Sequence, residues 1–531
     1  MKPSDNNKAQ INKAQEAFTV FTSKRDGNTK SLWQAGQKKS HNTIQAFEPE
    51  KVYDALIIGA GITGLSTALI LQKRGLSCII AEAHSVGFGT SGGTTAHINT
   101  FADTTYQEAE NGFGKEGAQL FSDAIRESVE LIKENINTYK IDCDFAVKKG
   151  YLYAEDDQQE KQLDELFNSA LKVGVKVAVT NFIPAEIPYK KAVVFEDQYQ
   201  FHPLKYLQAL NKGFSQAGGT LLENTPIDNL DLKDSIISAS SGKTIIKAKK
   251  TVYATHIPPG GINLLHFRNA PYRSYVIGAT LKNDNYPDGL IYDMQDPYHY
   301  FRTHEIDGQK YLIAGGNDHK TGQGDPEQSF SDLVEYSKKF FKVESVKFKW
   351  SSQYYIPTDG LPYIGHLPGA PDGVYTATGF NGNGVILGSI SAKILANLVT
   401  NQPDKYSELF APSRIKPITG FKEFVTENAD AAFHFIADRF SVHKVDSVNK
   451  IPNGSAEVIQ LDGNKIAVYK DETGKVFALN PVCTHAKCIV SWNTAEKSWD
   501  CPCHGGRFDV EGTVLTGPPR KNLQKINLEE L

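Results

Sequence analysis

The chain has 531 residues, a length that indicates about two to four domains rather than one core. Its net charge of −4, with both signs interspersed, leaves no basic patch for nucleic acid. No stretch approaches the roughly 20 apolar residues of a membrane span, and the polar start lacks the apolar run of a secretory signal. Six cysteines are too few for a disulfide scaffold in so long a chain. We therefore expect a cytoplasmic protein with no membrane span and no nucleic-acid partner.

Ordered structure is predicted to begin near residue 51. Residues 1–50 are polar and show little periodicity, so we expect a partly ordered N-terminal lead-in. The apolar run over 51–58 is typical of a buried parallel strand. A glycine-rich turn follows over 59–64, then a helix over 65–73 and a second strand over 77–81.

The glycine-rich turn predicts a dinucleotide site. Gly59 suits the tight turn, Gly61 lets the backbone approach a pyrophosphate, and Gly64 lets helix and strand pack closely. Negative charge is favoured at the N-terminus of the helix. Glu82, eighteen residues after Gly64, is placed to accept hydrogen bonds from a ribose. The predicted contacts are Gly59, Gly61, Ile62, Thr63, Gly64 and Glu82.

Two later segments are also rich in glycine. Residues 87–96 form a loop of small residues, which lets backbone amides crowd a ligand. Residues 379–384 open a helix over 385–399 and follow the sequence Asp-Gly-Leu-Pro-Tyr-Ile-Gly at 359–365. Because these glycine-rich motifs occur in this order along the chain, residues of about 50 to 400 resemble the FAD-dependent D-amino-acid-oxidase-like (DAO) superfamily, which includes glycine, sarcosine and gamma-glutamylputrescine oxidases.

The resemblance implies an FAD-binding domain of the Rossmann-like, glutathione-reductase type, α/β in class. The first glycine motif and its acid would hold the ADP half of FAD, and the two later segments would lie near the flavin, as would His97. The contacts implied for these segments are Thr90, Ser91, Gly93, Thr94, Thr95, Gly379, Asn381, Gly382 and Gly384. The local motifs of relatives that bind FAD covalently are not reproduced, so we expect noncovalent FAD.

The same resemblance implies an α+β substrate domain that is interleaved with the FAD-binding domain. Apolar residues at helical spacing over 121–136 and 163–171 are predicted to be core faces. We expect the FAD-binding domain over 51–100, 196–264 and 351–400, and the substrate domain over 101–195 and 265–350. Strands are predicted over 272–281, 311–314 and 347–355.

Candidate substrate residues cluster on two strand-like runs of the predicted substrate domain. They are Tyr272, Arg273, Tyr275, Tyr298, His299, Tyr300 and Arg302. An arginine here could clamp a substrate carboxylate through two hydrogen bonds, as in several amino-acid oxidases of the family. Tyr and Arg on strands are also ordinary surface residues. The catalytic residues therefore stay unknown, with Tyr272, Arg273, Tyr300 and Arg302 as candidates.

A linker with an amphipathic helix is predicted over 401–444. Prolines at 412 and 417 mark the linker, and apolar residues at helical spacing follow over 418–436. The polar face of this stripe carries acidic residues rather than the cationic bias of membrane-surface helices. We expect the stripe to pack on the flavin-binding body.

The last segment, 445–531, is predicted to be a small all-β domain because short runs alternate with turn sequences. It contains two Cys and His pairs, Cys483 with His485 and Cys501 with His504. Two thiolates on one iron and two imidazoles on the other are the ligands of a Rieske 2Fe-2S cluster. Zinc also accepts two cysteines and two histidines, but zinc fingers group their histidines together.

This segment also resembles the high-potential Rieske proteins of cytochrome bc complexes. The resemblance implies a disulfide between Cys488 and Cys503 that ties the two cluster loops, and it matches Gly-Pro-Pro at 517–519 to a proline-rich third loop. A disulfide is unusual in a reducing compartment, so burial beside the cluster would have to protect it.

The two predicted cofactors suit one another. A flavin accepts two electrons as a hydride and can release them singly, as a one-electron cluster requires. We expect oxidation of a C–N bond in a small amine or amino acid, with electrons passing from FAD through the cluster to a soluble acceptor protein. One alternative is reverse flow from a donor protein, for reduction or oxygenation of a substrate. Another is a redox sensor or electron carrier without turnover. No second dinucleotide motif is present for NAD(P)H, and no non-haem iron triad stands out.

Overall fold

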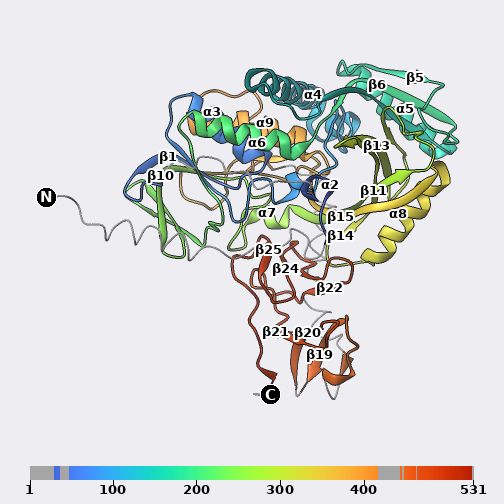
Figure 1. The fold of residues 1–531 in the computed structure, drawn as a ribbon. Helices are drawn as coiled ribbons and strands as arrows, with labels where there is room; N and C mark the ends of the chain where they lie inside the picture. The colour runs from blue at the N-terminus through green and yellow to red at the C-terminus, as the bar shows by residue number, and fades with distance from the viewer. Residues whose placement is uncertain (1–28, 36–46, 416–442, 445–447, 462, 529–531) are drawn as a thin grey trace.

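The computed structural model describes residues 29–35, 47–415, 443–444, 448–461 and 463–528 (Figure 1). Two large sheets with their covering helices form the body, and two small sheets form the C-terminal part. The amphipathic stripe predicted for 418–436 lies outside the described residues. In the described part of the chain, no helix is long and apolar enough to cross a membrane.

The first large sheet has eight strands and carries the glycine-rich turn. Its main path runs β16-β17-β10-β1-β2-β7, and only the β16 pairing along this path is antiparallel. Helices α3, α6 and α9 lie side by side over one face (Figure 1). The strands are β1 (Val52–Ile58), β2 (Cys78–Ala81), β7 (Thr220–Leu222), β8 (Asn229–Lys233), β9 (Ile236–Ser241), β10 (Thr244–Tyr253), β16 (Tyr363–His366) and β17 (Val374–Thr378). The helices are α3 (Ile62–Lys73), α6 (Pro203–Gln216) and α9 (Gly384–Val399).

The second large sheet has nine strands in the main order β15-β11-β14-β13-β12-β4-β6-β3, with β5 beside β6. Its strands are β3 (His97–Ile98), β4 (Ala146–Ala154), β5 (Val177–Thr180), β6 (Lys191–Gln200), β11 (Asn269–Leu281), β12 (Leu290–Tyr292), β13 (His299–Ile306), β14 (Gln309–Lys320) and β15 (Val343–Pro357). The helices that follow or cover it are α4 (Tyr106–Tyr139), α5 (Asp157–Lys172), α7 (Leu264–Phe267) and α8 (Pro326–Phe340). The N-terminal segment adds α2 (Leu32–Ala35), and η1 spans Thr90–Gly92.

The C-terminal part consists of two four-stranded sheets. Sheet β22 to β25 lies next to the body, and β19 to β21 lie farther from it (Figure 1). The strands are β18 (His443–Lys444), β19 (Ala456–Leu461), β20 (Asn464–Lys470), β21 (Val476–Leu479), β22 (Ser491–Asn493), β23 (Ser498–Asp500), β24 (Arg507–Phe508) and β25 (Val514–Thr516), with η2 over Val448–Lys450. An α/β body with an all-β C-terminal part confirms the predicted fold class.

The β1–α3 turn is shaped by its glycines. Gly59 has φ +107°, a conformation that favours glycine. A Cβ on Gly64 would lie 1.9 Å from the carbonyl oxygen of Gly59 and 3.3 Å from Cβ of Ala254 on the neighbouring strand connection. Helix α3 can therefore begin this close to β1 only if residue 64 has no side chain.

We predict that Gly64→Ala destabilises the body by about 1–3 kcal/mol, because the added methyl group overlaps backbone rather than a movable side chain. Thermal unfolding and the FAD content of the purified protein would measure the effect. Gly261→Ala is the matched control, since nothing lies within 4 Å of a Cβ there. Equal stability of the two variants would contradict this account of the turn.

Candidate active site and iron-sulfur site

A cavity of about 1450 Å³ extends from the end of β1 to the second sheet. Its wall includes Gly59 at the β1–α3 turn and Tyr298 and Tyr300 beside and on β13. The cavity exceeds the roughly 300–1,000 Å³ of common small-molecule pockets. It therefore has room for a dinucleotide together with a second, smaller ligand.

The residues predicted to contact FAD line this cavity, apart from Gly64 and Gly379, whose Cβ positions are filled by neighbouring protein atoms. The lining members are Gly59, Gly61, Ile62, Thr63, Glu82, Thr90, Ser91, Gly93, Thr94, Thr95, Asn381, Gly382 and Gly384. The open N-terminus of α3 and the glycine backbone fit a pyrophosphate. Their roles as individual cofactor contacts stay predictions.

Glu82 reaches back from the end of β2 to the glycine-rich turn. Its carboxylate accepts hydrogen bonds from the backbone N–H of Ala60 at 2.7 Å and of His84 at 2.9 Å. Burial raises the pKa of Glu82 to about 7, although both backbone donors favour the charged form. This side chain is thus a partly buried acceptor in the cavity wall, at the position where the motif predicts a ribose.

The small-residue loop is held by residues from distant parts of the chain. Trp33 donates its indole N–H to the carbonyl of Thr94 at 2.6 Å, and the Ser31 hydroxyl donates to the carbonyl of Gly92 at 2.6 Å. The Arg302 guanidinium, on β13, donates to the carbonyls of Thr95 at 2.8 Å and Ala96 at 2.9 Å. Part of the N-terminal lead-in therefore belongs to this site, a role that its polar composition did not indicate.

The clustered substrate candidates separate into two groups. Arg273, Tyr298 and Tyr300 line the cavity, and His97 lines it as well. The remaining four candidates are not among the lining residues and contact other parts of the protein. They are Tyr272, Tyr275, His299 and Arg302. Tyr272 packs near Tyr354, and Tyr275 hydrogen-bonds His319. His299 is held between Asp293 and Asn317, and Arg302 holds the small-residue loop.

The predicted cluster ligands converge in the C-terminal domain. Cys483 and Cys501 are both buried, neither is in a disulfide, and the neighbouring Cys501 is the main cause of the lowered pKa of Cys483. The rings of His485 and His504 meet edge-on with centroids 4.9 Å apart. Within the described structure, both ring nitrogens of His485 and Nδ1 of His504 are buried without a hydrogen-bond partner. Two thiols and two imidazoles with such nitrogens fit a 2Fe-2S cluster.

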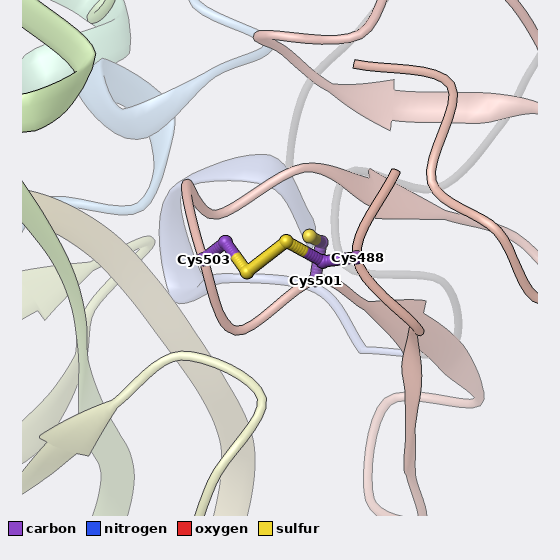
Figure 2. A group of neighbouring side chains, drawn as sticks. All are labelled: Cys488, Cys501 and Cys503. Carbon is purple, nitrogen blue, oxygen red and sulfur yellow. A yellow bond between two sulfur atoms is a disulfide. The ribbon is translucent and has the colours of Figure 1, made fainter. Parts of the chain in front are cut away.

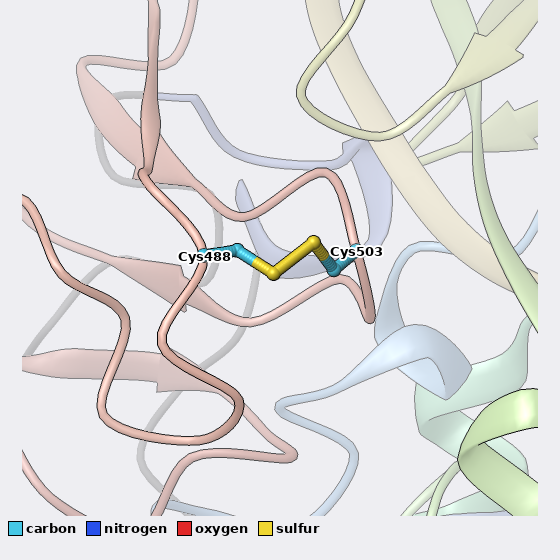
Figure 3. The surroundings of a disulfide bond; sticks show 2 residues. All are labelled: Cys488 and Cys503. Atoms are coloured by element: carbon cyan, nitrogen blue, oxygen red, sulfur yellow. A yellow bond between two sulfur atoms is a disulfide. The ribbon is translucent and has the colours of Figure 1, made fainter. Parts of the chain in front are cut away.

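The predicted disulfide between Cys488 and Cys503 is confirmed (Figure 3). The sulfur of Cys501 lies near this disulfide, and the three sulfurs lie within 4.8 Å of one another (Figure 2). This trio is not a metal site by itself, because the disulfide removes two of its three thiolates. The disulfide instead joins the loop of His485 to the loop of His504 beside Cys501.

A buried ion network joins the C-terminal domain to the body. Glu496, which is fully buried, receives the guanidinium of Arg273 at 2.6 Å and also pairs with Arg507. Arg507 pairs in addition with Asp500 at 3.0 Å, and Ser351 on β15 donates to Glu496. Two arginines are thus matched by two carboxylates out of contact with water, which fixes the domain against β11 and β15.

The cluster loops lie against the wall of the large cavity. Tyr355 donates its hydroxyl to the carbonyl of His504 at 3.0 Å and meets the ring of His256 edge-on at 4.7 Å. His256 lines the cavity and contacts the hydroxyl of Thr90 at 3.2 Å. The segment at 513–522 of the C-terminal domain, which includes β25, also contributes to the cavity lining.

His266 on α7 contacts both predicted histidine ligands. Its ring lies 4.5 Å from that of His485 and 5.7 Å from that of His504, between centroids. Its Nδ1 accepts from the backbone N–H of Asn263 at 3.0 Å, so Nε2 carries the proton donated to the carbonyl of Pro258 at 2.9 Å. No local motif marks His266, Tyr355 or Glu496, because their partners are remote in sequence.

This fold and site define an FAD-dependent oxidoreductase joined to a Rieske domain. The family described as FAD dependent oxidoreductase (DAO) matches residues 54–398, and the Rieske [2Fe-2S] domain family matches residues 441–527. The chain belongs to the DAO family of FAD-dependent oxidoreductases and carries a C-terminal Rieske domain. It is an oxidoreductase that binds FAD in the first region and a 2Fe-2S cluster in the second.

Relatives cover most of the chain. A protein of Bacillus subtilis named as a Rieske 2Fe-2S iron-sulfur protein is 31% identical over 490 residues, which span 92% of this chain and 96% of that protein. Gamma-glutamylputrescine oxidoreductase of Escherichia coli is 24% identical, over 73% of this chain and 93% of its own. The crystal structure of glycine oxidase from Geobacillus kaustophilus superimposes with a TM-score of 0.58 at 17% identity, over 69% of this chain and 99% of that chain.

We predict that Glu496→Gln destabilises the docked protein by about 3–5 kcal/mol, because it leaves Arg273 and Arg507 buried with one carboxylate fewer. Differential scanning calorimetry of the cofactor-loaded protein measures this. The control is Glu511→Gln, which breaks an exposed ion pair with Lys525 and should cost less than about 1 kcal/mol. A Glu496 variant as stable as this control would show that the network does not hold the domain.

We also predict that FAD retention weakens as pH falls through about 7, the value to which desolvation raises the pKa of Glu82 in the cofactor-free protein. Ribose hydroxyls favour the charged carboxylate, so binding below this pH releases a proton and affinity falls by at most about tenfold per pH unit. Equilibrium dialysis of FAD over this range tests the slope, and Glu82→Gln should remove it. An unchanged slope in that variant would assign the titration to another group.

Proposed function

We propose that the protein oxidises a C–N bond of an amine or amino acid at FAD and passes the electrons through the Rieske cluster to an external one-electron acceptor. One observation carries this proposal: the loop with His504 is hydrogen-bonded to Tyr355, which contacts His256 in the wall of the FAD cavity. Both redox sites therefore share one wall. Relatives named as a gamma-glutamylputrescine oxidoreductase and a glycine oxidase support the substrate class.

When bound, FAD would supply two-electron chemistry at the C–N bond, and the cluster would supply one-electron exchange. The chain's own residues would hold these groups in place. Glu82 and the α3 N-terminus would bind the nucleotide half, and Cys483, His485, Cys501 and His504 would bind the cluster. The buried network around Glu496 would hold the C-terminal domain against β11 and β15.

We predict that Cys483→Ser abolishes cluster assembly but leaves reduction of FAD by substrate intact. Turnover with a one-electron acceptor should then collapse, because the exit for single electrons is lost. An anaerobic screen of amines and amino acids, followed at the flavin and cluster absorption bands, would identify the substrate and measure both steps. Cys143→Ser serves as control, since Cys143 is another buried free cysteine in the body.

Two outcomes would overturn the proposed direction. The first is a Cys483 variant that turns over at the parent's rate with the same acceptor. The second is a parent protein whose reduced flavin reacts with oxygen faster than it reduces the cluster. Reduction of the flavin by an electron-donor protein through the cluster would instead favour reverse flow.

A further inference from the structure

One end of the FAD cavity combines carboxylates with tyrosine rings. Asp103 lines the cavity, and its carboxylate accepts from the backbone N–H of Gly382 at 2.7 Å, close to the start of α9. The position of a Cβ on Gly382 would lie 2.8 Å from Asp103 Oδ2 and 3.5 Å from the Tyr298 hydroxyl. Asp103 and Tyr298 therefore approach the same point of the wall. Tyr300 stands next to Tyr298, with ring centroids 5.8 Å apart.

A second carboxylate lies directly behind this wall. Tyr354, which lines the cavity, donates its hydroxyl to Asp318 Oδ2 at 2.8 Å, and Oδ1 of Asp318 is buried with no hydrogen-bond partner among the described residues. Desolvation raises the pKa of Asp318 to about 7, and it also raises the pKa of Asp103, whose side chain faces the cavity rather than the protein core. Across the part of the chain that the structure describes, neither carboxylate has a lysine or arginine within 4.0 Å.

A third acceptor faces the same region. Asn381 lines the cavity and is 8% exposed, and its amide nitrogen donates to the Thr104 hydroxyl at 3.0 Å. Its Oδ1 is buried without a partner in the described structure. The wall thus offers acceptors and negative charge, which call for a ligand that brings N–H donors and positive charge.

The arginines that line the cavity do not neutralise the negative charge of these carboxylates. Arg273 and Arg507 are matched by Glu496 and Asp500, and Arg520 donates to the Tyr253 hydroxyl at 2.7 Å on the opposite, nucleotide-binding side. Arg273 binds Glu496 and Ser351 through Nη2, so a substrate carboxylate held by this guanidinium would compete with the fully buried Glu496.

We propose that this wall is an ammonium site: Asp103 and the rings of Tyr298 and Tyr300 bind the cationic amino group of the substrate, and Asp318 supports them through Tyr354. The inference rests on the proposed function and narrows it to amines that carry no carboxylate beside the reacting nitrogen. Tyrosine faces attract an ammonium through their quadrupoles, and the carboxylate of Asp103, which is exposed to the cavity, adds charge-assisted hydrogen bonds.

Binding of two matched ions to the oxidised, FAD- and cluster-loaded protein tests the site without turnover. tert-Butylammonium has no hydrogen on the carbon beside nitrogen and so cannot be oxidised, and pivalate has the same shape with the opposite charge. We expect tert-butylammonium to perturb the flavin absorption bands and pivalate to do so at least tenfold more weakly. Equal or tighter binding of pivalate would overturn the proposal, and this comparison needs no variant.

Substitutions then assign the residues. Asp103→Asn keeps an acceptor for Gly382 but removes the charge, and should weaken tert-butylammonium binding roughly 10- to 100-fold. Asp318→Asn should weaken it by a smaller factor, and Tyr298→Leu should weaken it more than Tyr298→Phe, which keeps the ring. Asp372→Asn, at an exposed carboxylate that does not line the cavity, is the control and should change nothing. Unchanged affinity in both Asp103→Asn and Asp318→Asn, each shown to retain FAD, would overturn the assignment.

The results of these experiments distinguish failure of the ammonium site from failure of the proposed function. If α-amino acids bleach the flavin and simple amines do not, the proposed function holds and the ammonium site is wrong. If tert-butylammonium binds as expected while no amine or amino acid bleaches the flavin, the ammonium site holds and the proposed oxidation is wrong.

Discussion

The pairing of Glu496 with Arg273 and Arg507 is the interaction on which the arrangement of the two redox sites depends. It takes Glu496 and Arg507 from the C-terminal domain and Arg273 from β11, and it lies where water cannot replace any of these partners. Charges buried in this way tolerate little displacement, since a separated guanidinium or carboxylate would remain unsolvated. The hydrogen bond from Tyr355 to the His504 loop and the contacts of His266 follow from that placement.

The network also explains why the large cavity has contributions from both domains. Because the C-terminal domain is held against β15, its segment at 513–522 forms part of the wall on the nucleotide side. On the opposite side, the matched arginines leave the carboxylates Asp103 and Asp318 uncompensated beside the tyrosines. One interface thus contributes to the position of the cluster site and to the charge at the end of the cavity that contains Asp103 and Asp318.

Contiguous motifs could be read from the sequence, whereas remote pairings could not. The strand, glycine turn and acid around Gly59 and Glu82 were predictable because each element follows the last within one βαβ unit. The cysteines of the disulfide were found through the resemblance to Rieske proteins. Glu496 was missed because its partner Arg273 is 223 residues away, and nothing local distinguishes it from a surface acid.

The alternation of side chains along a strand could not predict which residues of β13 line the cavity. Tyr300 and Arg302 are two apart on β13 and so share a face of the sheet. Residues two apart are separated by roughly 7 Å along a strand. That distance carries Arg302 past the cavity to the carbonyls of Thr95 and Ala96, whereas Tyr300 remains in the cavity wall. Alternation predicts a face of the sheet but not a position along it.

The contact of His266 with both cluster histidines favours a cluster site that stays in one position during electron transfer over one that moves between two positions. While His485 and His504 lie against α7, that side of the cluster site is occupied largely by the protein's own chain. Under the proposed function, electrons would arrive on this inner side, and a visiting carrier would collect them from another side. Electrons would then enter and leave the cluster on different sides, so electron transfer would not require the C-terminal domain to move away from the body.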